Sequence, residues 1–189
     1  SHVVFYSTDA DGNYLQRFVA DFSSSDTEIA GIHVTAMQSK LPSVSIEISE
    51  NAPSLDDLEA SENHSVKTYA SMELVSLTDE KYVSKIEMRG RGNISWLEDK
   101  KSYQIKTSKA LNLLNMGSAK EWILLANAAD YSLLRNEVFL GMAADMGLEY
   151  TPEIQETDLF INGEYRGTYS LCTKVEKGIN RVNIGKEDY

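Results

Sequence analysis

The sequence RGRGNISW at residues 89–96 interrupts an alternating strand pattern with two glycines that are separated by one residue. Glycine allows the backbone to approach a ligand closely, and Arg89 and Arg91 place positive charge beside that backbone. A turn of this kind is suited to hold a phosphate group. Taken alone, however, the motif favours an ordinary hairpin turn whose arginines pair with surface carboxylates.

Alternating apolar and polar residues predict strands on both sides of this turn. The predicted strands are residues 43–50, 69–77, 82–89, 101–107, 121–126, 157–161 and 165–175. The dipeptide Asn162-Gly163 predicts a tight hairpin between the last two of them. A separate hairpin is predicted at residues 3–22, with its turn at residues 9–13.

One principal helix is predicted after these central strands. Asp130 or Ser132 can cap it, its body covers residues 133–146, and Gly147 is a suitable stop in the left-handed conformation. The segment at residues 51–65 is acidic and poor in apolar side chains, which indicates a surface excursion. The sequence therefore predicts an α+β fold, an antiparallel β-sheet with one principal α-helix.

Composition excludes several classes of protein. The chain has 29 acidic and 18 basic residues in 189, a formal net charge of −11 and a pI near 4.7, so its overall field repels nucleic acid. No apolar run approaches the length that spans a bilayer, so we expect no membrane insertion. Cys172 is the only cysteine and is expected to be a buried thiol. Nothing in the sequence indicates an oligomeric state.

The order of elements is that of the amino-terminal lobe of a protein kinase, in which a glycine turn precedes a strand with a phosphate-contacting lysine. The kinase signature GxGxxG itself is absent. Lys101 and Lys106 are the candidate lysines, and they point to opposite faces because they lie five residues apart on one strand. We favour Lys106 because it directly follows the apolar alternation. Two solvated lysines at the strand ends are the remaining alternative.

Several blocks of sequence together resemble the CotH (spore coat protein H) family of atypical kinases. They span residues 89–184 in the family's order and read RGRGNISW, KKSYQIK, NLLNMGSAKEWILLANAADYSLLRNE, MGLEYTP, LFINGEYRGTYSL and NRVNI. The resemblance implies a kinase-like amino-terminal lobe at residues 81–189, preceded by a strand-rich lead-in at residues 1–80. The family's carboxy-terminal lobe, with its metal-binding and catalytic aspartates, is expected outside this chain.

The resemblance also implies a function. Some members of the family transfer phosphate from ATP to serine residues of proteins, with Mg or another divalent metal. We therefore expect ATP and a divalent metal as cofactors of the intact protein, and a coat or surface protein as substrate or partner. The expected location is extracellular or at the surface or coat of a bacterial cell. This chain by itself is expected to be inactive as an enzyme. The alternative is a catalytically inactive module for surface binding, adhesion or scaffolding.

The same resemblance suggests which residues form the site. Five residues of the opening stretch are expected near the phosphates, and Lys106 is expected to contact them; the five are Arg89, Gly90, Arg91, Gly92 and Asn93. A second group is expected to support the start of the helix rather than to bind ligand, and consists of Asn127, Asp130, Arg135 and Asn136. No metal ligand or catalytic residue is expected within the chain. Thr173 stands where the family usually has a glutamate, so the role of that glutamate is in doubt here.

Overall fold

A computed structural model describes residues 2–8, 14–21 and 40–184 of the chain. It divides into two compact units, Ser1–Gln38 and Ser39–Tyr189. In the first unit, strands β1 (His2–Thr8) and β2 (Tyr14–Asp21) pair in antiparallel orientation. The hairpin predicted there is confirmed, whereas its predicted turn at residues 9–13 lies outside the described residues.

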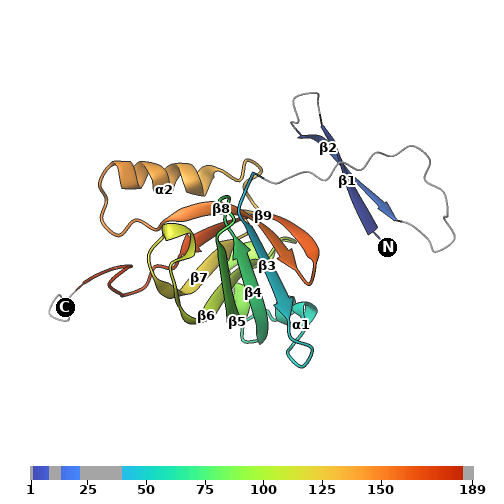
Figure 1. Ribbon diagram of the computed structural model, residues 1–189, viewed down its shortest axis with the longest axis horizontal. Helices are drawn as coiled ribbons and strands as arrows, with labels where there is room; N and C mark the ends of the chain where they lie inside the picture. The colour runs from blue at the N-terminus through green and yellow to red at the C-terminus, as the bar shows by residue number, and fades with distance from the viewer. Residues whose placement is uncertain (1, 9–13, 22–39, 185–189) are drawn as a thin grey trace. The chain divides into compact units, whose positions relative to one another are not determined.

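The second unit is a closed barrel of seven strands (Figure 1). Their order around the barrel is β3-β4-β5-β6-β7-β9-β8. The strands are β3 (Ser43–Ile48), β4 (Lys67–Val75), β5 (Lys81–Arg91), β6 (Ser102–Leu111), β7 (Ala119–Leu125), β8 (Ile154–Ile161) and β9 (Glu164–Thr173). All neighbours are antiparallel except β3 and β8, which run parallel and close the barrel.

The predicted fold class, an open α+β sheet of the kinase-lobe type, is wrong. Each strand of the barrel was expected locally, but the pairing of Ser43–Ile46 with Asp158–Ile161 was not. Because this parallel pairing joins segments that are far apart in sequence, no local sequence pattern predicts it. It also makes β3 and β4, which fall within the predicted lead-in at residues 1–80, part of the same barrel as the later strands.

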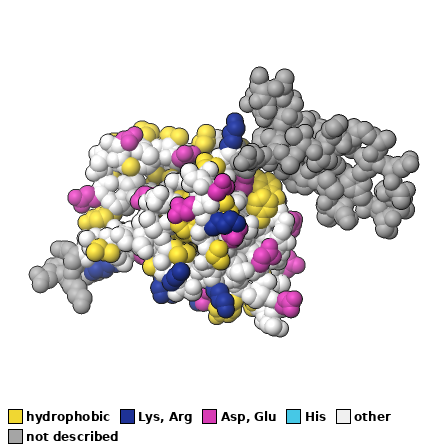
Figure 2. Space-filling view, viewed as in Figure 1, with side chains coloured by type: hydrophobic (Ala, Val, Ile, Leu, Met, Phe, Trp, Pro, Cys, Tyr) yellow, Lys and Arg dark blue, Asp and Glu magenta, His cyan; other side chains and the backbone are white. Residues whose placement is uncertain are grey.

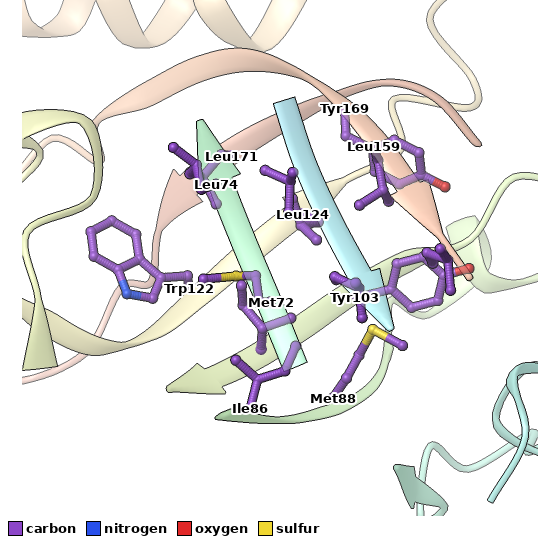
Figure 3. Close-up of a cluster of buried hydrophobic side chains, with 14 of the residues drawn as sticks. Met72, Leu74, Ile86, Met88, Tyr103, Trp122, Leu124, Leu159, Tyr169 and Leu171 are labelled. Carbon is purple, nitrogen blue, oxygen red and sulfur yellow. The ribbon is translucent and has the colours of Figure 1, made fainter. Parts of the chain in front are cut away.

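The barrel interior is filled by every second side chain of each strand. On β4, for example, Ala70, Met72 and Leu74 point inward and are almost completely buried, while their sequence neighbours face outward. Figure 3 shows inward-pointing side chains of the barrel strands meeting in one cluster, with Trp122 at one end of it and Tyr103 at the other. Burial of a large apolar side chain stabilises a fold by about 1.5–3 kcal/mol, so this cluster is the main source of the barrel's stability.

Among the residues that the structure describes, two α-helices lie outside the barrel. The short α1 (Leu55–Glu59) begins with a capping box, in which Ser54 and Asp57 each bind the other's backbone N–H. The longer α2 (Arg135–Asp145) has Met146 as its C-cap and is followed by Gly147, whose φ of +73° confirms the predicted left-handed stop. Within the described residues, no helix is both long enough and apolar enough to cross a membrane.

The apolar side chains of α2 are exposed. None of its residues is buried, and Val138 and Phe139 are 52% and 68% exposed. Figure 2 shows yellow apolar side chains along this helix. The apolar side chains of this helix therefore face solvent in this unit.

Candidate functional site

The outer face of the barrel carries cross-strand rows of polar and charged side chains. Lys67 on β4 lies opposite Arg89 on β5, which lies opposite Gln104 on β6. The Arg89 guanidinium donates a hydrogen bond of 2.9 Å to Gln104 Oε1. Gln104 in turn donates from Nε2 to Glu121 Oε2 at 2.6 Å. These bonds fix the Arg89 side chain against the sheet instead of leaving it free in solvent.

The next row contains Lys106, opposite Glu87 on one side and Glu121 on the other. Lys106 Nζ lies 3.6 Å from Glu121 Oε1, and Lys174 Nζ donates to Glu121 Oε2. The hydrogen bond from Lys174 lowers the pKa of Glu121, and Lys106 adds to the effect. Burial alone would lower the pKa of Lys174, but its hydrogen bonds to Glu121 and Glu176 outweigh burial and raise that pKa.

These rows surround a depression of about 200 Å³. We call it the charged depression; it is lined by Lys67, Glu87, Arg89, Gln104, Lys106, Glu121 and Lys174. Its lining contains four cations and two carboxylates, and Lys174 also pairs at 3.3 Å with Glu176 outside the lining. Lys67 Nζ pairs with Glu87 at 2.8 Å. Figure 2 shows such basic and acidic side chains interspersed over one face of the barrel. The excess positive charge stands out in an acidic chain and suits an oxyanion such as phosphate.

The two glycines of the stretch RGRGNISW are required by the local fold. A Cβ on Gly90 would lie 2.4 Å from Cη2 of Trp96, so only glycine leaves room for that buried indole. Gly92 has a φ of +128°, which favours glycine, and leads into the 3₁₀ turn η1 (Ile94–Trp96). Of the five residues expected near phosphates, Arg89 lines the charged depression, whereas Gly90, Arg91, Gly92 and Asn93 do not.

Lys106 and Lys101 have different surroundings. Lys106 lines the charged depression with 53% of its side chain exposed. Lys101 instead donates to the backbone carbonyls of Trp96 and Glu98 at 2.7 and 2.6 Å, and so closes the loop after β5. The neighbouring Lys100 reaches across to β9, where Nζ donates to Thr168 O at 2.5 Å. Burial lowers the pKa of Lys100.

The second predicted group lies at the start of α2. Asp130 accepts hydrogen bonds from Ser132 and from the Arg135 N–H, and these bonds lower its pKa. Asn136 Nδ2 donates to Asn127 Oδ1 at 2.8 Å, and Asn127 Nδ2 donates to Ser170 Oγ on β9 at 2.6 Å. This network joins the helix to the barrel. None of the four predicted residues lines the charged depression.

Sequence reasoning missed most of the charged depression. Lys67, Glu87, Gln104, Glu121 and Lys174 come from four different strands and the segment after β9, and they meet only through strand register. Alternation along each strand predicts that these side chains point outward. It does not predict which side chains of the adjacent strands lie beside them. Thr173, where the family usually has a glutamate, is buried and its Oγ1 accepts from the Glu153 N–H at 2.9 Å.

Comparison with known proteins gives one result that identifies a family. No curated protein matches the chain significantly. The family model described as CotH kinase protein matches residues 86–189, which is more than half of the chain and includes all the strands from β6 onward together with α2. It also covers the stretch RGRGNISW and most residues of the charged depression. The chain therefore belongs to the CotH kinase family.

Proposed function

We propose that this chain supplies the nucleotide-binding part of a CotH-type protein kinase, which transfers a phosphoryl group from ATP to serine residues of coat or surface proteins. The observation that carries the proposal is the charged depression, where Arg89 and Lys106 lie with two further lysines on one face of the barrel. Family membership supports the reaction class. The phosphates bind to these cations, and the acceptor is a protein at the cell surface or coat.

The residues of the charged depression fit phosphate better than metal. Glu87 and Glu121 are already paired with lysines, so neither carboxylate is available as a metal ligand without breaking an ion pair. Among the residues that the structure describes, no three His, Cys, Asp or Glu side chains gather in a possible metal site. The divalent metal therefore enters with ATP in the intact protein, and none of these residues serves as its ligand.

Titration of the full chain with Mg-ATP tests this proposal. We expect Mg-ATP to raise Tm at millimolar concentration, because a ligand that binds only the native state stabilises it. Lys106→Ala should weaken binding about tenfold, which corresponds to about 1.4 kcal/mol. Lys109→Ala is a matched control, since Lys109 is exposed on the same strand but lies outside the charged depression. Absence of any Tm shift, or equal losses for the two variants, would refute nucleotide binding at this site.

One observation favours a second function, that of a binding or scaffolding module. The exposed apolar side chains of α2 include Val138, Phe139 and Met142, and Leu134 just before the helix is also half-exposed. Contiguous exposed apolar side chains commonly mark contacts between proteins. This alternative predicts that Mg-ATP leaves Tm unchanged while the chain self-associates in sedimentation experiments, and that Phe139→Asp abolishes the association. A monomeric wild-type chain that responds to Mg-ATP would exclude it.

A further inference from the structure

A second and larger depression adjoins the charged depression on the outer face of β4, β5 and β6. Its volume of about 550 Å³ is in the usual range for small-molecule sites. The two depressions share Glu87 and Lys106, so a single ligand can occupy both. The larger one is bounded by side chains of different chemistry, among them Tyr69, Ser71, Lys85, Ser108 and Lys120.

Tyr69 is the aromatic residue of this larger depression. Its side chain is 56% exposed although it belongs to a central strand of the barrel. Tyr69 lies opposite Glu87, which lies opposite Lys106, so all three stand in one row on the outer face. Two strand spacings separate Tyr69 from Lys106, which is about 10 Å. An exposed aromatic ring at this distance from a phosphate-binding lysine is suited to stack on a planar ring of the same ligand.

The charges of the larger depression favour an anionic ligand. Neither Lys85 nor Lys120 forms an ion pair with any other residue that the structure describes. Lys106 shares Glu121 with Lys174, so its own charge is only partly compensated. A ligand that combines negative charge with a flat ring therefore matches both depressions, and a nucleoside phosphate has this combination.

We propose that Tyr69 stacks against the base of the nucleotide whose phosphates bind in the charged depression, with the ribose lying between them over Glu87. This inference rests on the proposed function and adds the position of the base. It names Tyr69 as a binding residue outside the family-matched segment, which begins at residue 86. An acidic peptide would also be attracted by the lysines, but its binding would not require an aromatic ring.

Comparison of two probes tests the inference, because ATP carries a base and inorganic tripolyphosphate does not. Their affinities would be measured by calorimetry on the full chain, in the presence of Mg²⁺, for the wild type, Tyr69→Ala and Tyr69→Phe. Loss of stacking should weaken ATP binding about 5- to 150-fold in Tyr69→Ala. Tripolyphosphate affinity should be unchanged in that variant, and Tyr69→Phe should retain wild-type affinity for ATP. Tyr131→Ala, which removes a fully exposed tyrosine elsewhere, is the matched control.

The outcomes separate this inference from the proposed function. If Tyr69→Ala binds ATP as the wild type does, or loses both probes equally, the base does not stack on Tyr69. The proposed function survives that result when Lys106→Ala still weakens both probes. If the wild type binds neither probe, the proposed function fails and the position of the base fails with it. If instead an acidic peptide binds, and Lys85→Ala weakens that peptide but not ATP, the larger depression is a peptide site. Because Tyr69 is exposed, Tm and circular dichroism should show that each variant is folded.

Discussion

Gly90→Ala should destabilise the barrel through a single methyl group. The added Cβ would lie 2.4, 2.7 and 2.9 Å from three ring carbons of Trp96, a side chain that is only 6% exposed. Such distances are well inside van der Waals contact, so the indole or the β5 backbone must shift. Overpacking of this kind costs about 1–3 kcal/mol. For a unit of this size, we expect Tm to fall by about 2–12 °C.

Thermal unfolding followed by circular dichroism measures this effect, with Gly141→Ala as the matched control. A Cβ on Gly141 meets nothing within 4 Å, and alanine is favoured over glycine inside a helix by about 1 kcal/mol. The control should therefore leave Tm unchanged or raise it. The destabilisation by Gly90→Ala should also shrink when Trp96→Phe removes the clashing ring atoms. Costs that simply add in the double variant would refute the steric argument.

Three further predictions concern individual side chains. Lys101→Ala should lower Tm by several degrees without altering nucleotide affinity, because Lys101 donates to loop carbonyls and does not line the charged depression. A loss of nucleotide affinity in titration would contradict this assignment. The folded state lowers the pKa of Glu121, so its pairing with Lys174 stabilises the fold above the carboxyl's unfolded pKa and is lost as pH falls through the folded pKa. The Tm difference between wild type and Glu121→Gln should thus be largest near neutral pH and vanish in acid, and a constant difference would contradict this. Burial raises the pKa of Cys172 to about 12, so a thiol reagent at pH 8 should modify the denatured chain and spare the native one.

Local signals in the sequence predicted the strands of the barrel well. Asn162 and Gly163 adopt φ of +51° and +75° in the turn between β8 and β9, as the dipeptide predicts, because few other residue pairs tolerate positive φ at both positions. Trp122 and Tyr169 are buried, which fits large aromatic residues in alternating strands. These features depend on neighbours in sequence, which is why they were accessible without a structure.

The register between strands and the closure of the barrel could not be predicted from the sequence. The charged depression depends on Lys67, Arg89 and Gln104 being aligned across three strands, and alternation fixes the face of each residue but not the residue opposite. For the same reason the strand pattern predicted that Lys101 and Lys106 point to opposite faces, but not the ion pair of Lys106 with Glu121. The role of Gly90 was also hidden, because its contact with Trp96 depends on how the following loop folds back over the strand.

Closure of the barrel has a consequence for synthesis of the chain. Ile48 N–H donates to Asn162 Oδ1 at 2.9 Å across 114 residues, beside the parallel pairing of β3 with β8. On the ribosome, β3 to β7 emerge well before β8, so the nascent sheet presents unpaired strand edges until residue 161 is available. Exposed edges promote pairing between chains, and pairing over such long separations is slow. The rate at which the nascent chain reaches β8 therefore sets how long it must be protected from aggregation.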